Sequence, residues 1–316
     1  MRLDTAADPR GSQTVVLVDL AHLGAIEVSG ADAEQFISGQ FTNDFAAVDD
    51  RHAAIGAWCS ANGRVQLVFR VLRWRRGFLL LVPRALLAST LKRLALYVLR
   101  ARVQVSDASA DYDLLGLIGT GSTARLRSLF SDLPQRADEV THEAGRALMM
   151  LPGPVPRFMV LGGREAITAF KDQLGPDLAE ETPSYWLRQD ILAGLPLILA
   201  ETAGSFLPQT LNLEALGGLS YKKGCYPGQE VIARLRYRGE LKKRMYRAHS
   251  EPGRSPAPGD PIVAGDGSLR GTVLIAVREG GGGSALLAVM DIGAAERQTL
   301  YLGSTDGPQI RIESLP

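Results

Sequence analysis

The stretch that most constrains this chain is residues 220–235, which read S-Y-K-K-G-C-Y-P-G-Q-E-V-I-A-R-L. Pro227 fixes its own φ and Gly228 accepts a positive φ, which is the order of residues that a type II turn requires. We therefore expect the chain to reverse sharply just after Cys225. The apolar run that follows the turn fits either a helix or a strand.

Lys222 and Lys223 lie close before Cys225 in the sequence. Ammonium groups near a thiol favour the thiolate, which is the form that attacks electrophiles and binds soft metals. Free cysteines are commonly buried and inert, but glycine, proline and lysine around this one are typical of a surface turn. We predict that Cys225 and Lys223 are the catalytic residues, and a buried structural cysteine is the alternative. Cys59 lies in an apolar run and is predicted to be a core residue.

Two separated blocks of the sequence resemble a known family. Residues 223–230, K-G-C-Y-P-G-Q-E, are similar to the signature of the YgfZ-type folate-binding proteins. These proteins are relatives of the glycine cleavage T-protein and are linked to iron–sulfur cluster assembly or repair. Residues 29–44, S-G-A-D-A-E-Q-F-I-S-G-Q-F-T-N-D, resemble the N-terminal signature that both groups share. Residues 193–218 continue at the family spacing into the cysteine motif.

The resemblance implies an α+β, T-protein-like multidomain fold with mixed antiparallel sheets, helices and a small C-terminal antiparallel β-barrel. Local patterns agree, because the apolar runs 65–74 and 78–82 flank a glycine loop and precede leucines at helical spacing. After residue 245, short β-branched runs separated by Gly, Pro and Asp turns are typical of a small barrel. We predict three domains, at residues 1–110, 111–240 and 241–316.

The resemblance also implies that tetrahydrofolate is the cofactor. Trp186 aligns with a tryptophan that lines the folate cavity of the family, and a flat indole suits stacking on a pterin. A tryptophan that faces the core is the alternative interpretation. The predicted cofactor-binding residues are Trp186, Asn43, Asp44, Gln209, Tyr226, Gln229, Glu230 and Arg234.

Three departures from the family pattern weaken this expectation. The T-protein carries a catalytic aspartate in a stretch that aligns with residues 62–67, where this chain has no carboxylate. Aminomethyl transfer needs an acid or base beside the folate nitrogens, so ordinary T-protein activity is not expected. The glutamate that binds the pterin aligns with Leu192, and a cavity tryptophan aligns around His22. Weak folate binding is therefore predicted, and whether the chain catalyses any reaction stays open.

The net charge is only +1, but the charged residues are unevenly distributed along the chain. Residues 51–106 contain eleven Lys or Arg and no Asp or Glu, and residues 222–247 contain nine against two glutamates. If the two segments share a face, that face would attract a polyanion such as RNA or a polyglutamylated cofactor. Ordinary solvated faces are the alternative.

Two cysteines are too few for a disulfide framework, and neither has the spacing of a zinc or cluster site. No resident metal is therefore predicted. The first ten residues have no apolar segment and the apolar runs are too short to span a bilayer, so we expect a cytoplasmic protein without a membrane partner.

These observations favour a folate-binding accessory factor in iron–sulfur cluster assembly or repair, which acts through Cys225 and affects tRNA modification indirectly. Its expected partners are a folate derivative and iron–sulfur client or assembly proteins, with RNA as a further possibility. Two alternatives stay open. One is a folate-dependent one-carbon transferase, for aminomethyl or methyl groups, and the other is a basic RNA-binding module.

Overall fold

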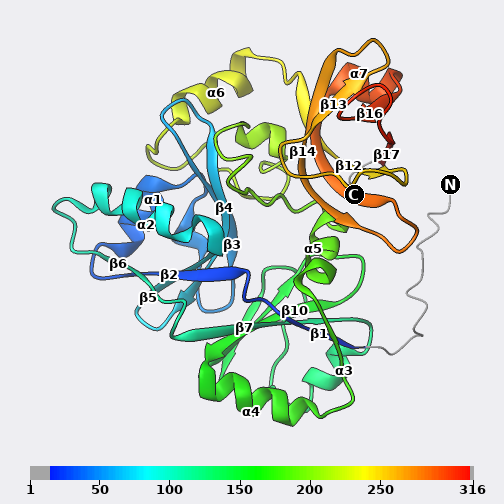
Figure 1. Ribbon diagram of the computed structural model, residues 1–316. Helices are drawn as coiled ribbons and strands as arrows, with labels where there is room; N and C mark the ends of the chain where they lie inside the picture. Colours follow the sequence, from blue (N-terminus) through cyan, green and yellow to red (C-terminus); the bar gives the residue numbers. More distant parts are fainter. Residues whose placement is uncertain (1–14, 314–316) are drawn as a thin grey trace.

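The computed structural model describes residues 15–313 and arranges them as two β-sheets with helices and a separate β-barrel (Figure 1). The first ten residues, which entered the prediction of localisation, lie outside this range. No helix within residues 15–313 is long and apolar enough to cross a membrane.

The first sheet has five antiparallel strands in the order β3, β4, β5, β2, β6. Their bounds are β2 Leu23–Ser29, β3 Ala54–Cys59, β4 Val65–Trp74, β5 Gly77–Pro83 and β6 Gln104–Asp107. The predicted hairpin is therefore present as β4 and β5, and the predicted helix after it is α2 (Arg84–Val98). Helix α1 (Ala33–Gln40) and the 3-10 helix η1 (Phe45–Ala47) connect β2 to β3.

The second sheet has six strands in the order β11, β1, β7, β10, β9, β8, and β1 pairs in parallel with β11. The bounds are β1 Val16–Asp19, β7 Tyr112–Ile118, β8 Val140–Glu143, β9 Arg146–Leu151, β10 Arg157–Gly163 and β11 Ala179–Glu181. Helices α3 (Ser122–Leu126) and α4 (Arg164–Leu174) accompany this sheet. Strand β1 belongs to it although it lies early in the chain, and the three-domain division stays a prediction.

Alternation of side chains along the strands explains how the layers stack. In β5, Phe78 and Leu80 belong to a core shared with α1 and α2, whereas Leu79 and Leu81 belong to a second core shared with the second sheet. Successive side chains of a strand point to opposite faces, so a strand that is apolar throughout must be covered on both. The other face of the second sheet packs on α3 and α4. The result is four layers, with helices outside and the two sheets between them.

Strands β12, β15, β14, β13, β16 and β17 close the predicted antiparallel barrel. The bounds are β12 Lys243–Ser250, β13 Pro261–Ala264, β14 Leu269–Arg278, β15 Ser284–Asp291, β16 Leu300–Leu302 and β17 Gln309–Glu313, with α7 at Ile292–Arg297.

The segment between the second sheet and the barrel contains α5 (Pro183–Leu192), the 3-10 helix η2 (Pro208–Leu211) and α6 (Gln229–Arg238). The core of the first sheet extends through Tyr226 and Ile232 to Met245 of β12. The cysteine motif therefore lies where the first sheet, α6 and the barrel meet, at the top of the view in Figure 1.

Candidate functional site

Cys225 is exposed and immediately precedes the predicted turn. Gly228 has φ +81° and ψ 0°, and the Gln229 N–H donates to the Tyr226 carbonyl oxygen at 3.2 Å. These values match a type II turn with Pro227 and Gly228 at its centre. Helix α6 begins at Gln229, so a helix and not a strand follows the turn. The exposure of Cys225 rules out the alternative of a buried structural cysteine.

The turn between β3 and β4 packs directly on the cysteine turn. The Gly63 N–H donates to the Ser60 carbonyl oxygen at 2.8 Å, and Gly63 has φ +71°. A Cβ atom on Gly228 would lie 2.5 Å from the Ser60 oxygen and 2.6 Å from the Gly63 Cα. The two backbones can approach this closely because both turns have glycine at the contact. Residues 62–67, the segment without a carboxylate, therefore begin beside the cysteine motif.

Lys223 joins the cysteine loop to the end of α1. Its ammonium donates to the carbonyl oxygens of Ser38 and Phe41, and to that of Asn43 at 3.0 Å. It also lies 4.8 Å from the centre of the Tyr226 ring. Burial lowers the pKa of Lys223 to about 8, against a smaller opposing effect of Asp44. Because an ammonium has three N–H groups and three carbonyls accept them, the geometry assigns Lys223 an anchoring role, and its catalytic role stays a prediction.

The two sequence blocks that resemble the family meet in space. The Ser220 N–H donates to the Thr42 carbonyl at 2.9 Å, and the Thr42 hydroxyl donates to the Gly218 carbonyl at 2.7 Å. Next to them, the Asn43 amide donates to the Ile55 carbonyl at 2.8 Å, and Asp44 caps η1 by accepting from the Ala46 N–H. These contacts hold the chain in place, and the folate contacts predicted for Asn43 and Asp44 stay predictions.

A layer of buried polar side chains surrounds the motif. The Gln209 amide donates to the Ile232 carbonyl at 2.7 Å, while its own carbonyl oxygen has no partner within residues 15–313. Tyr226 is 6% exposed, its hydroxyl likewise lacks a partner there, and burial raises its pKa. Cys59 is buried, as predicted, and burial raises the pKa of its thiol to about 12.

The three remaining predicted residues of the motif lie on α6. Gln229 is partly buried, whereas Glu230 and Arg234 are exposed. They follow the cysteine turn in the sequence, and their role in folate binding stays a prediction.

Comparisons with known proteins identify the family. Residues 11–151 match the family described as GCVT N-terminal domain. A Shigella boydii protein named tRNA-modifying protein YgfZ is 31% identical over 305 residues, which cover 96% of this chain and 93% of that protein. A Klebsiella pneumoniae protein with the same name is 33% identical over the same shares of the two chains. The chain belongs to the YgfZ family. The predicted resemblance is therefore confirmed.

A solved structure confirms the predicted fold of this YgfZ-family chain. The glycine cleavage system aminomethyltransferase T from Bartonella henselae superposes with a TM-score of 0.77, covering 96% of this chain and 86% of that one. The two sequences are 15% identical, so the likeness shows the fold alone.

Trp186 of this YgfZ-family chain lies in a different core from the cysteine motif. It is 2% exposed and belongs to the core between the two sheets, whereas Tyr226 belongs to the core of the first sheet. A Cβ on Gly116 would stand 2.4 Å from the indole, and the Arg157 guanidinium lies 4.9 Å from the ring centre. The indole is thus packed into the core, and its stacking on a pterin stays a prediction.

Beside Trp186 lies a group of buried charges that sequence reasoning missed. The Arg157 side chain is fully buried and donates to the Pro152 carbonyl and to the Asp190 carboxylate, both at 2.7 Å. Arg70 pairs with Asp138, and burial together with the nearby Arg157 lowers the pKa of Arg70 to about 10. Arg157 is the only charged residue in the otherwise apolar strand β10. This is the sequence feature from which the buried ion pair could have been suspected.

The residues at the expected folate contacts do not fit a tightly bound pterin. The side chain of Leu192 offers no acceptor to the pterin edge, and its backbone carbonyl already accepts from Arg247 at 2.8 Å. The Asp190 carboxylate, two positions earlier, is paired with Arg157. Among residues 15–313, no group of three or more His, Cys, Asp or Glu could hold a metal ion.

The cations of the first basic segment, residues 51–106, are spread over several parts of the fold. Arg70 is buried, and Arg73 pairs with Glu34 at 2.9 Å. Arg76 follows the far end of β4, which is about 30 Å of strand away from the turn at Gly63. These three arginines therefore do not join the second segment, whereas Arg64 follows the Gly63 turn that packs on the cysteine motif, and convergence of the two segments stays a prediction.

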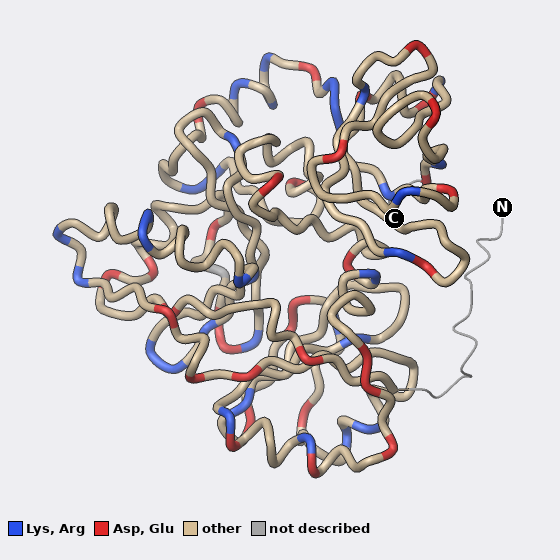
Figure 2. The backbone as a smooth tube through the Cα atoms, viewed as in Figure 1, with Lys and Arg blue, Asp and Glu red and all other residues tan. Residues whose placement is uncertain are grey.

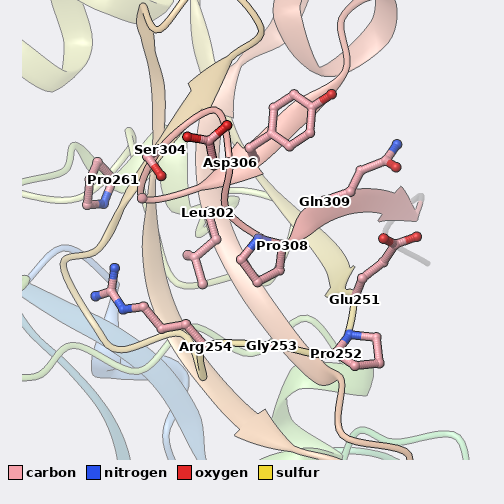
Figure 3. A pocket seen from close by; sticks show the side chains of 13 residues that line it. Glu251, Pro252, Gly253, Arg254, Pro261, Leu302, Ser304, Asp306, Pro308 and Gln309 are labelled. Carbon is pink, nitrogen blue, oxygen red and sulfur yellow. The ribbon is translucent and has the colours of Figure 1, made fainter.

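A pocket of about 760 Å³ lies on the barrel, between the segment after β12 and the turn that joins β16 to β17 (Figure 3). Its charged lining residues include Glu251, which pairs with Arg311, and Arg254, which pairs with Asp260. None of the predicted site residues lines it.

Proposed function

We propose that this YgfZ-family chain is an accessory factor in iron–sulfur cluster assembly or repair, which acts through the Cys225 thiol and so supports iron–sulfur-dependent tRNA modification. The observation that carries the proposal is an exposed thiol on a turn that is held in place from both sides. The name of the relatives, tRNA-modifying protein, supports the connection to tRNA.

Because the loop is anchored on both sides, the Cys225 thiol keeps a fixed position for contact with another protein. Lys223 fixes the chain two residues before the sulfur, and the contact of Gly228 with Gly63 fixes it three residues after. A pre-ordered loop loses less conformational entropy when a partner docks on it. Cys225 is therefore presented on a fixed support, where a partner can reach it.

One thiolate limits the chemistry that the site performs alone. Iron–sulfur clusters are held by several cysteine ligands, four in the common types. A single thiolate therefore binds iron or a cluster together with ligands from the client or assembly protein. The cluster is then a substrate of this chain and not its resident cofactor. Reduced folate enters the proposal as a weak ligand on which no step depends. Calorimetry with millimolar tetrahydrofolate tests that part, because the absence of any heat would remove folate from the proposal.

Complementation tests the role of the thiol. A bacterial strain that lacks its own YgfZ relative receives the wild-type chain, Cys225→Ser or the matched control Cys59→Ser. Iron–sulfur-dependent modified nucleosides in total tRNA are then quantified by mass spectrometry, and immunoblots verify equal protein levels. We expect Cys225→Ser to fail and Cys59→Ser to restore modification. Full complementation by Cys225→Ser would refute the proposal.

A further inference from the structure

The end of α6 and the chain that follows it carry a dense group of cations. Residues 234–244 contain six Arg or Lys against Glu240. Figure 2 shows them as blue segments along α6 and at the approach to β12, on the outer edge of the molecule. We call the residues Arg234, Tyr237, Arg238 and Lys242 the α6 surface.

Half of these six cations already have partners inside the protein. Arg236 pairs with Glu214, Lys243 pairs with Asp291 at 3.5 Å, and the Arg244 guanidinium donates to Asn212 at 2.9 Å. The other three, Arg234, Arg238 and Lys242, are exposed and have no ion pair within residues 15–313. Three cations at the outer edge are therefore available to an anionic ligand.

An exposed aromatic side chain lies among these cations. Tyr237 is 71% exposed, although a tyrosine usually buries most of its ring. Its ring centre lies 6.4 Å from that of Tyr221 in an edge-on arrangement. Arginine and lysine neutralise phosphates, and exposed aromatic rings stack on unpaired bases.

We propose that the α6 surface binds a single-stranded segment of RNA. Arg234, Arg238 and Lys242 contact its phosphates, and a base stacks on Tyr237. Unpaired bases are required because the bases of a duplex are already stacked on each other. Arginine and tyrosine are also common in protein interfaces, so the cations and the ring fit an acidic protein as well. The name of the relatives, tRNA-modifying protein, favours RNA as the ligand. The proposal goes beyond the role of the Cys225 thiol and does not depend on it.

Fluorescence anisotropy of the full-length chain tests the proposal, with a labelled single-stranded oligoribonucleotide as the probe at several KCl concentrations. The triple variant Arg234→Ala, Arg238→Ala, Lys242→Ala should lower the slope of log Kd against log salt by about 2, because each phosphate contact on a single strand contributes about 0.7. Tyr237→Ala should weaken binding by about 5- to 150-fold, which corresponds to the loss of one stacked base. Tyr237→Phe keeps the ring and should bind as the wild type does.

A matched control removes three exposed cations elsewhere, namely Arg76→Ala, Lys92→Ala and Arg100→Ala. It should bind RNA as tightly as the wild type. Equal losses in the two triple variants, no effect of Tyr237→Ala, or tight binding of polyglutamate without binding of RNA would each overturn the proposal. Cys225→Ser should bind RNA normally. Failure of complementation with intact RNA binding, or the reverse, therefore separates this proposal from the proposed function.

Discussion

Replacement of Gly228 by alanine perturbs the contact between the two turns directly. The φ of +81° lies in the left-handed region, where a side chain costs about 1–2 kcal/mol. The new Cβ would also lie 2.5 Å from the Ser60 oxygen, 2.6 Å from the Gly63 Cα and 2.7 Å from the Gly63 nitrogen. These are backbone atoms that cannot rotate away, and overpacking of this kind costs about 1–3 kcal/mol. We therefore expect Gly228→Ala to lower the free energy of unfolding by about 2–5 kcal/mol.

Thermal unfolding measures this loss. At about 2.1 cal/mol/K per residue, a chain of 316 residues has an unfolding entropy of about 0.66 kcal/mol/K. A loss of 2–5 kcal/mol then lowers Tm by about 3–8 °C. Gly224→Ala is the matched control in the same loop, because its Cβ would meet no atom within 4 Å and its φ is not positive. Gly224→Ala should shift Tm by less than about 1 °C.

Either of two results would refute the reasoning. An unchanged Tm for Gly228→Ala would mean that the two turns are not in contact, and an equal loss for Gly224→Ala would mean that the loop is sensitive to any side chain. Amide hydrogen exchange gives a second readout. The Gln229 N–H, which closes the turn at 3.2 Å, should exchange faster in Gly228→Ala and unchanged in Gly224→Ala.

Three further predictions concern the thiols and the buried charges. Iodoacetamide should modify Cys225 long before Cys59, because Cys225 is exposed, whereas Cys59 is buried and burial raises the pKa of its thiol to about 12, which leaves very little thiolate at neutral pH; equal rates by peptide mass spectrometry would contradict the structure. Arg157→Met leaves the carboxylate of Asp190, 17% exposed, without its partner, and should cost about 3–5 kcal/mol, measured as a lower urea midpoint; an unchanged midpoint would argue against the pair. The pKa of Lys223 is about 8 in the folded chain against 10.5 normally, so the unfolded chain binds more protons between these values. Stability of the wild type relative to Lys223→Met should therefore rise from pH 8 to pH 10, and a fall would reverse the sign of the pKa shift.

Local chemistry explains which parts of the site were predictable from sequence. Pro227 and Gly228 specify a type II turn through their own backbone preferences, so the turn could be predicted without knowledge of the rest of the chain. The β4–β5 hairpin and the closed barrel were predictable for the same reason, because short apolar or β-branched runs bounded by turn residues are local patterns. The choice between helix and strand after Gln229 was not predictable, since both patterns fitted the short apolar run.

Contacts between distant residues explain what could not be predicted. The carbonyls that accept from Lys223 belong to residues 38, 41 and 43, which are 180 or more positions away. Backbone carbonyls carry no residue-specific signal, so no sequence pattern points to them. The pairing of Arg157 with Asp190 is equally hidden, because it depends on how β10 meets α5.

The position of Lys223 changes how the thiol is understood. The sequence places an ammonium two residues from the sulfur and suggests that it acts on Cys225 by charge. In the folded chain, carbonyl oxygens of residues 38, 41 and 43 accept its three N–H groups, and the Tyr226 ring lies beside it. Its three N–H groups therefore join the cysteine loop to the end of α1 and to the residues that follow it. The lysine thus fixes the position of the Cys225 thiol, and in the proposed function the remaining ligands of iron or a cluster come from the client or assembly protein.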